Sequence, residues 1–153
     1  MAIGYTGNPA RGYAVGDLIR SIDGLFENKR DQKAALVGIG KLGRAILTYI
    51  ALRKTQPVIV AAFDSDPAKA QGDIAGCPCH PLDTLPAVIS REGITIGIVT
   101  VPAEAAQRVA DLMLMAGVRG LLNFAPTPLK TPRWAVVENV DITTKLETVA
   151  FFC

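Results

Sequence analysis

Short apolar segments alternate with segments of helical period along most of this sequence, and this alternation limits the folds open to the chain more than any other feature. Five segments are apolar or β-branched and are bounded by turn residues, which is typical of strands buried on both faces of a sheet. They are residues 34–39, 57–63, 95–101, 120–124 and 136–140. Apolar residues that recur every three or four positions predict helices at residues 42–53, 82–91, 102–117 and 141–152.

Strands that alternate with helices of this length pair in parallel through right-handed crossovers. We therefore expect an α/β fold with a doubly wound, mostly parallel sheet. Residues 15–26 also have helical period, and the charged run at residues 27–33 follows them, which predicts a connecting helix and a linker. The expected parts are a loop and connecting helix at 1–30, the doubly wound domain at 31–140 and a terminal helix at 141–153.

The composition excludes several classes of protein. The chain has 153 residues, of which 50% are hydrophobic and 20% charged, so it is neither disordered nor too short to bury a full core. It has no stretch of about 18 uncharged apolar residues that would span a membrane, and its first residues have no apolar signal segment. A net charge of +2, spread along the chain, argues against a nucleic-acid-binding surface. Three cysteines, an odd number, suit a reducing compartment, so we expect a cytoplasmic protein.

A glycine-rich turn stands where the first predicted strand ends and the next predicted helix begins. Its residues follow the pattern G-x-G-x-x-G and are Gly38, Ile39, Gly40, Lys41, Leu42 and Gly43. The first glycine permits a tight turn, the second lets the backbone approach a pyrophosphate, and the third lets the helix pack close to its strand. N–H groups at the start of the helix attract the phosphate charge. The turn therefore predicts a phosphate-binding site lined by these six residues.

Asp64 narrows the choice of nucleotide. It ends the second apolar segment and follows the last glycine of the turn by 21 residues. An acidic residue about 20 residues after such a turn holds the diol of an adenosine ribose. Its charge repels a 2′-phosphate, so the predicted ligand is NAD(H) rather than NADP(H). Two alternatives stay open: the turn binds nothing, or it binds another nucleotide such as coenzyme A.

The carboxyl ends of two later strands are expected to flank the nicotinamide half of the ligand, because ligands bind at this edge of such sheets. The residues at these ends are Thr100, Val101 and Pro102, and Asn123, Phe124 and Ala125. They offer apolar walls and backbone groups but few titratable side chains. No Ser/His/Asp set, carboxylate pair or tyrosine–lysine pair can be assembled near the hydride position. The sequence therefore predicts a cleft that binds its cofactor without consuming it, in a protein that is not an enzyme.

The segment Cys77-Pro78-Cys79-His80 suggests a metal site or a thiol switch. A structural zinc site needs four ligands, usually in spaced pairs, and Cys153 is the only other thiol. We therefore favour the simpler interpretation, in which Cys77 and Cys79 are small apolar residues in a turn near a strand and His80 is exposed. No metal is predicted.

Several segments together resemble the NAD(H)-binding domain of the Rex family of redox-sensing transcriptional repressors. They are ALVGIGKLGRAIL, AAFDSDPAK, HPLDTLP, VPAEAAQRVADLMLMAGVRGLLNFAP and VENVDITTKLETVAFF, and the resemblance runs from about Gly12 to the C-terminus. It implies a Rossmann-type fold that binds NAD(H) and responds to the NADH/NAD⁺ ratio. Tyr49 matches the family tyrosine near the nicotinamide, and Asp141 matches an aspartate that changes partners between redox states.

The resemblance also bears on partners. In the family the terminal helix is exchanged between two subunits, which implies a homodimer through residues 141–153; the alternative is that this helix packs on its own sheet. The family's N-terminal winged helix is almost entirely missing from these residues, so we expect DNA binding only if such a domain is supplied elsewhere. The expected function is an NAD(H)-binding redox-sensing and dimerisation domain. The alternative is a coenzyme A-binding or NAD-dependent oxidoreductase domain on the same fold.

Overall fold

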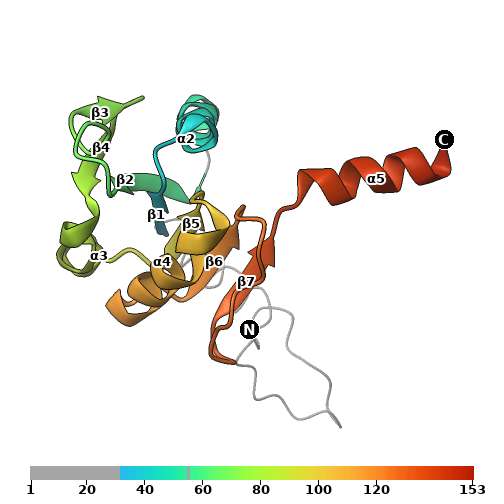
Figure 1. Cartoon of the computed structure of the whole chain (residues 1–153). Coiled ribbons are helices and arrows are strands. Elements are labelled where there is room, and N and C mark those ends of the chain that lie inside the picture. The colour runs from blue at the N-terminus through green and yellow to red at the C-terminus, as the bar shows by residue number, and fades with distance from the viewer. Residues whose placement is uncertain (1–31, 55) are drawn as a thin grey trace, which may run out of the picture.

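A computed structural model describes residues 32–54 and 56–153, and its centre is one seven-stranded sheet (Figure 1). The strands are β1 (Lys33–Val37), β2 (Val58–Asp64), β3 (Asp73–Ile74), β4 (Cys77–Pro81), β5 (Ile96–Val99), β6 (Gly120–Asn123) and β7 (Val136–Asn139). The helices are α2 (Lys41–Arg53), α3 (Leu85–Glu92), α4 (Ala103–Ala116) and α5 (Ile142–Phe152), with a 3₁₀ turn at Leu82–Thr84 before α3.

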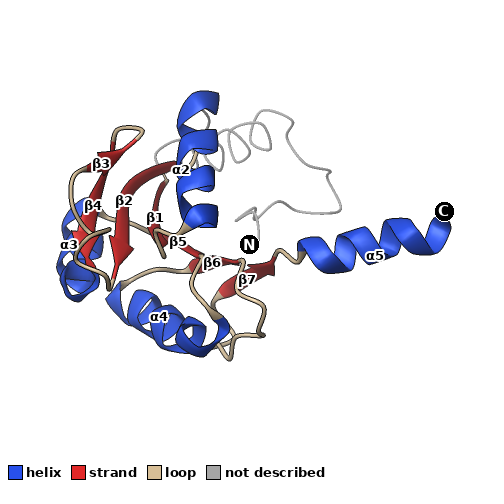
Figure 2. Cartoon of the chain, turned by 45° about the horizontal axis from the view of Figure 1, so that its top comes forward, coloured by secondary structure: helices blue, strands red, loops and turns tan. Residues whose placement is uncertain are grey.

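The strands lie in the order β3-β4-β2-β1-β5-β6-β7, and every pair except β3 with β4 is parallel. Helix α2 covers one face of the sheet, whereas α3 and α4 pack side by side on the other (Figure 2). The order reverses at β1, since β2 lies on one side of it and β5 on the other. The expected α/β fold with a doubly wound, mostly parallel sheet is therefore confirmed, and the crevice at β1 is where such sheets bind ligands.

The core has two layers because successive residues of β1 point to opposite faces of the sheet. Ala35 and Val37 pack with the residues of α3 and α4, whereas Ala34 and Leu36 pack with Leu47 of α2. All four of these β1 residues are buried. A strand that is buried on both faces has a continuous apolar sequence, which is why residues 34–39 could be predicted as a strand.

The β3–β4 hairpin corrects the sequence prediction. Cys77 and Cys79 belong to strand β4 rather than to a turn, and both side chains are buried under α2. His80 is half-buried rather than exposed, with its ring 5.5 Å from the ring of Phe63 on β2. The turn of the hairpin is formed instead by Ala75 and Gly76, which both have positive φ, 51° and 82°.

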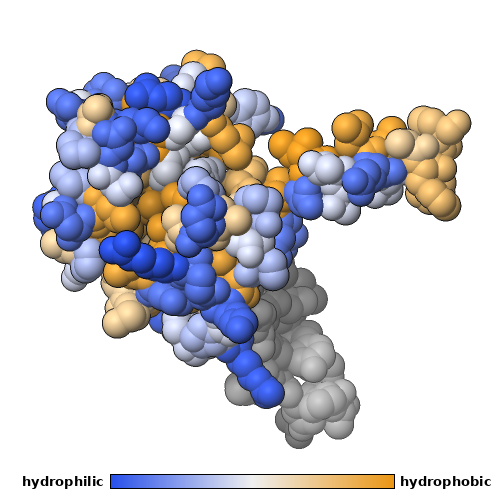
Figure 3. All heavy atoms as spheres, viewed as in Figure 1, coloured by the Kyte–Doolittle hydropathy of each residue, from blue (hydrophilic) through white to orange (hydrophobic). Residues whose placement is uncertain are grey.

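Helix α5 extends away from the sheet, and every one of its residues is exposed (Figure 1). None of its residues is buried against the described part of the chain, so the alternative of local packing is not what the structure shows. Apolar side chains cover much of its surface (Figure 3). The other predicted terminal element, the helix at residues 15–26, lies outside the described residues. None of the described helices is both long and apolar enough to cross a membrane.

Candidate functional site

The glycine turn joins β1 to α2 and fits closely against its neighbours. Gly38 has a φ of +108°, and a Cβ at this position would overlap the backbone carbonyl of Thr100. A Cβ at Gly43 would overlap the carbonyl oxygen of Gly38. At Gly40, in contrast, no atom of the described chain lies within 4 Å of an added Cβ. Two of the glycines are therefore required for packing, whereas Gly40 leaves open space in front of the backbone.

The start of α2 is free to receive an anion. Its N-cap residue is Gly40, no side chain of the described residues caps the helix, and its first turn has no acidic residue. The exposed Lys41 adds a positive charge at the same place. Uncapped N–H groups and the positive end of the helix dipole make such a terminus favourable for phosphate.

Two side chains brace this turn. The Thr100 hydroxyl lies 2.9 Å from the carbonyl oxygen of Val37 and 2.8 Å from that of Gly38. Asp64, at the end of β2, accepts a hydrogen bond from the Ile39 N–H through Oδ2 and one from the Asp66 N–H through Oδ1, both at 2.8 Å. A carboxylate has about four acceptor positions. Asp64 can therefore hold the turn and still accept hydrogen bonds from the hydroxyls of a ligand.

A cleft of about 510 Å³ opens in front of the turn, which we call the first lobe. Nine predicted residues line it: Gly38, Gly40, Lys41, Leu42, Asp64, Thr100, Val101, Pro102 and Phe124. The predicted site residues did not include seven others: Val37, Ser65, Lys69, Leu82, Ala105, Val109 and Pro126. Leu82 follows β4, the strand that the sequence did not reveal, so the sequence did not place Leu82 at the cleft.

A second cavity of about 490 Å³ continues the cleft toward α5, and we call it the second lobe. It shares Leu42, Phe124 and Pro126 with the first lobe, so the two are continuous. Three more predicted residues line it: Asn123, Ala125 and Asp141. The two lobes give an elongated cleft across the carboxyl edge of the sheet, and a dinucleotide, with two nucleosides joined by a pyrophosphate, has a matching shape.

Asp141 contributes charge to the second lobe. It is the N-cap of α5 and accepts hydrogen bonds from the backbone N–H of Thr144 at 3.2 Å and from its hydroxyl at 2.7 Å. These two hydrogen bonds lower the pKa of the Asp141 carboxyl, so the group is negatively charged at neutral pH.

Three predicted residues do not line the cleft. The Ile39 side chain is buried in the core and only its N–H faces Asp64. Gly43 lies beneath the turn. Tyr49 is 58% exposed on α2, outside both lobes, where it is hydrogen-bonded to Arg53 and carries the Arg53 guanidinium 5.0 Å from its ring centroid.

The two cysteines of β4 are separate from this cleft. Burial raises the pKa of the Cys77 thiol to about 12, with smaller contributions from Cys79 and Asp73, and burial also raises the pKa of Cys79. A thiol that stays protonated is a poor nucleophile and a poor metal ligand. In the part of the chain that the structure describes, no three His, Cys, Asp or Glu residues lie together in a way that would hold a metal ion.

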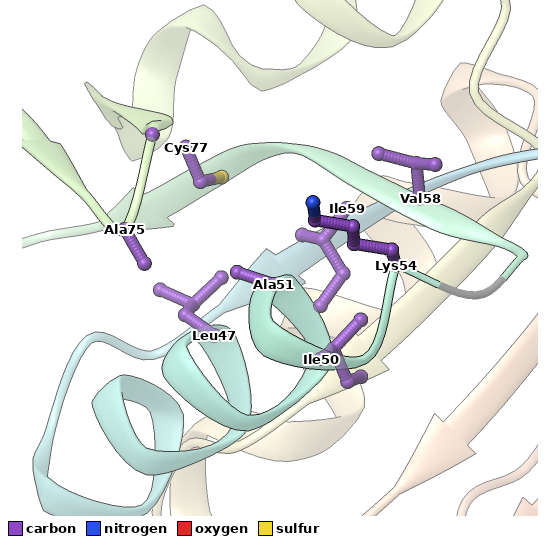
Figure 4. A pocket seen from close by; sticks show the side chains of 9 residues that line it. Leu47, Ile50, Ala51, Lys54, Val58, Ile59, Ala75 and Cys77 are labelled. Atoms are coloured by element: carbon purple, nitrogen blue, oxygen red, sulfur yellow. The ribbon is translucent and has the colours of Figure 1, made fainter.

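An apolar pocket of about 300 Å³ lies at the other end of α2, away from the glycine turn (Figure 4). Leu47, Ile50 and Ala51 of the helix face β2 and the β3–β4 turn across it. None of the predicted site residues lines this pocket, and among the described residues Lys54 supplies its only charged group.

Comparisons with known proteins agree with this architecture. The family described as CoA binding domain matches residues 29–127. The redox-sensing transcriptional repressor Rex of Brevibacillus brevis is 38% identical over 151 residues, which are 99% of this chain and 73% of that protein. The structure of the Rex-family repressor RSP in complex with β-NADH has a TM-score of 0.77 and 30% identity, covering 92% of this chain and 68% of RSP. RSP in complex with β-NAD⁺ and operator DNA has the same TM-score and 29% identity, covering 99% of this chain.

Proposed function

The chain belongs to the Rex family of redox-sensing transcriptional repressors, and from that premise we propose that its two-lobed cleft binds NAD(H) and senses the oxidation state of the nicotinamide. The observation that carries the proposal is the combination of an uncapped α2 terminus with the Asp64 carboxylate at the end of β2. RSP, which shares the fold, forms complexes with both β-NADH and β-NAD⁺.

In this proposal the first lobe holds the adenosine diphosphate half of the ligand. The pyrophosphate lies against Gly40 and the first N–H groups of α2, with Lys41 nearby. Asp64 accepts hydrogen bonds from the two ribose hydroxyls. The apolar side chains of Leu82 and Val101 line the space left for the adenine ring.

The second lobe takes the nicotinamide, and Asp141 distinguishes its two oxidation states. The oxidised ring is a cation and the reduced ring is neutral. A charged Asp141 at the wall of the lobe attracts the oxidised ring, whereas beside the reduced ring it keeps only its hydrogen bonds to the first turn of α5. The change of oxidation state thus alters the interactions at the first turn of α5.

The proposed cleft binds its ligand and does not catalyse hydride transfer. The titratable side chains that line the two lobes are Lys41, Asp64, Lys69 and Asp141. No histidine, tyrosine or cysteine lines either lobe within the described residues. Lys41 and Lys69 could act as general acids, but both line the first lobe, away from the proposed nicotinamide position. The close relatives are named as repressors, which agrees with a binding role.

We propose that residues 141–153 form a dimerisation element that is exchanged between two subunits, and that residues 31–140 bind the cofactor. Helix α5 exposes Ile142, Leu146 and Val149, which are spaced by four and three residues. Helix α2 exposes Leu42, Tyr49 and Leu52, which are spaced by seven and three residues. Apolar stripes of this kind pack together as antiparallel or parallel helix pairs. The partner's α5 would then cover Tyr49, which places this tyrosine at an interface rather than in the cleft of its own chain.

Calorimetric titration of the full chain with NADH and with NAD⁺ tests the proposal. We expect NADH and NAD⁺ to bind with different affinities, and equal affinities would remove the sensing role. Asp64→Ala is expected to lower the affinities for NADH and for NAD⁺ by about ten- to hundredfold, which is the effect of losing hydrogen bonds to a charged group. Asp83→Asn, which changes an exposed carboxylate outside both lobes, is the matched control.

Coenzyme A is the second candidate ligand, because the matching family is described as CoA binding domain. The Asp64 carboxylate would repel the 3′-phosphate that coenzyme A carries on the same ribose. We therefore expect coenzyme A to compete poorly with NADH. Tight binding of coenzyme A, together with weak binding of NADH, would replace the proposed function.

A further inference from the structure

Asn123 is the one polar residue in the core of the described residues, with a side chain 1% exposed. Its amide is fully hydrogen-bonded. Oδ1 accepts from the N–H of Ala125 at 3.0 Å, and Nδ2 donates to the carbonyl oxygen of Thr127 and to Oδ1 of Asn139, both at 3.0 Å. Because a buried amide with missing partners is costly, these three contacts fix where the partners lie.

The partners of Asn123 belong to two different parts of the cleft. Ala125 and Thr127 lie in the loop after β6, which forms the floor of the second lobe. Asn139 is the last residue of β7 and stands opposite Asn123 in the register of the sheet. The next residue, Val140, donates its N–H to the carbonyl oxygen of Asn123 at 2.9 Å, and Asp141 then begins α5. One buried side chain therefore connects the floor of the cleft with the root of α5.

We propose that the Asn123–Asn139 hydrogen bond couples occupation of the second lobe to the orientation of α5, with Asn139, which itself lines this lobe, as a positioning residue. The inference rests on the proposed function and extends it. A ring that lies over the 124–127 loop displaces Ala125 or Thr127. Asn123 cannot lose either partner without leaving a buried polar group unpaired, so it follows the loop and moves Asn139 with it.

Because Asn139 is exposed, its coupling role can be tested without a large loss of stability. Its side chain lies at the surface, so truncation leaves no cavity in the core. The Asn123 amide then loses one acceptor at a place that water can reach. The expected effect is on the link between cleft and helix rather than on folding.

The experiment uses the full chain with a nitroxide spin label on Cys153. This cysteine is exposed beside the end of α5, whereas Cys77 and Cys79 are buried and stay unlabelled. The label reports the environment of α5, and NADH binding is followed in the same samples by the fluorescence of the reduced ring. In the unaltered chain we expect the label spectrum to differ between the NADH and NAD⁺ complexes.

Asn139→Ala changes a residue that lines the second lobe, so the label is compared in complexes saturated with NADH and with NAD⁺. The label spectra give the ratio of two α5 orientations in each complex. The change in this ratio between the NADH and NAD⁺ complexes should fall by about three- to tenfold, which is the contribution of one neutral hydrogen bond. Asn139→Asp keeps an acceptor for Asn123 Nδ2 and should restore the shift. Glu138→Gln, on the same strand and also exposed, should behave like the unaltered chain.

The possible outcomes distinguish a failure of the coupling role from a failure of the proposed NAD(H) binding. If the unaltered chain does not bind NADH, the proposed function fails. If it binds NADH but Asn139→Ala keeps the full shift, the coupling role is wrong. The coupling role is also wrong if Asn139→Ala unfolds or loses NADH binding, because the residue is then structural or part of the ligand site.

Discussion

Replacing Gly43 with alanine tests the packing of the glycine turn without any ligand. An added Cβ would overlap the Gly38 carbonyl oxygen and lie 3.1 Å from its carbon and 3.2 Å from Cδ2 of Leu36. The first two atoms are backbone and cannot rotate away. Overpacking costs about 1–3 kcal/mol, and backbone contacts place this site near the upper value. The higher helix propensity of alanine returns about 1 kcal/mol, so the expected net loss is about 2 kcal/mol.

Gly40→Ala is the matched control in the same turn. An added Cβ there meets no atom within 4 Å, and a φ of −90° suits alanine. The weaker N-cap and the smaller entropy of the unfolded chain roughly offset each other, so stability should change by less than about 0.5 kcal/mol. The added methyl group would, however, occupy the space where the pyrophosphate approaches. NADH affinity should therefore fall by about ten- to hundredfold.

Thermal unfolding of the free protein, followed by circular dichroism, gives the stability readout. A loss of about 2 kcal/mol corresponds to a decrease in Tm of about 4–8 °C for a domain of this size. NADH fluorescence titrations give the binding readout. The reasoning is refuted if Gly43→Ala melts with the unaltered chain, or if Gly40→Ala lowers Tm as much as Gly43→Ala does.

Three further substitutions test the core, the hairpin turn and the buried thiol. Met113→Ala should cost about 2–5 kcal/mol in urea unfolding because this side chain is fully buried, whereas Met115→Ala on the exposed side of the same helix should cost less than about 0.5 kcal/mol. Ala75→Gly should stabilise the protein by about 0.5–1 kcal/mol, since φ is 51° at this position; a lower Tm would contradict the turn geometry. The folded-state pKa of Cys77 is raised from 9.0 to about 12, so its protonated form stabilises the fold below pH 9 and this contribution is lost as the pH rises from 9 toward 12. Urea unfolding should therefore show the unaltered chain losing stability relative to Cys77→Ala above pH 9, and parallel curves would refute the burial of this thiol.

The elements that the sequence predicted are those whose pattern arises from burial on both faces of the sheet. Strand β1 and helix α2 appear within one or two residues of their predicted bounds. The β3–β4 hairpin gave no such signal. Strand β4 contains Pro78 and Pro81, which are rare in strands, and the turn carries Ala75 where asparagine or glycine is usual. The strand forms because it pairs with β2, and the residue pattern of a segment does not identify the strand with which it pairs.

Parts of the candidate site could also be predicted from local sequence, whereas other parts depend on how the strands and helices are arranged. The glycine turn and Asp64 are local signals, and the structure brings them together through the Ile39–Asp64 hydrogen bond. The Asn123–Asn139 contact depends on the register between β6 and β7, which residue patterns do not specify. Tyr49 lies eight residues after Lys41, about 12 Å along α2 from the turn, so helix geometry carries it beyond the lobes of its own chain.

Helix α5 links the proposed sensing to the proposed dimer. It has 11 residues, and isolated helices shorter than about 12–15 residues are marginal in water. Burial against a second subunit would stabilise it, since Ile142, Leu146, Val149, Phe151 and Phe152 are all exposed. At about 1.5–3 kcal/mol for each side chain, this burial is worth on the order of 10 kcal/mol per subunit before the entropy of association is subtracted. Formation of α5 and formation of the dimer would then be one cooperative event. A ligand that acts on Asp141, at the first turn of this helix, can therefore shift the dimer without any rearrangement of the sheet.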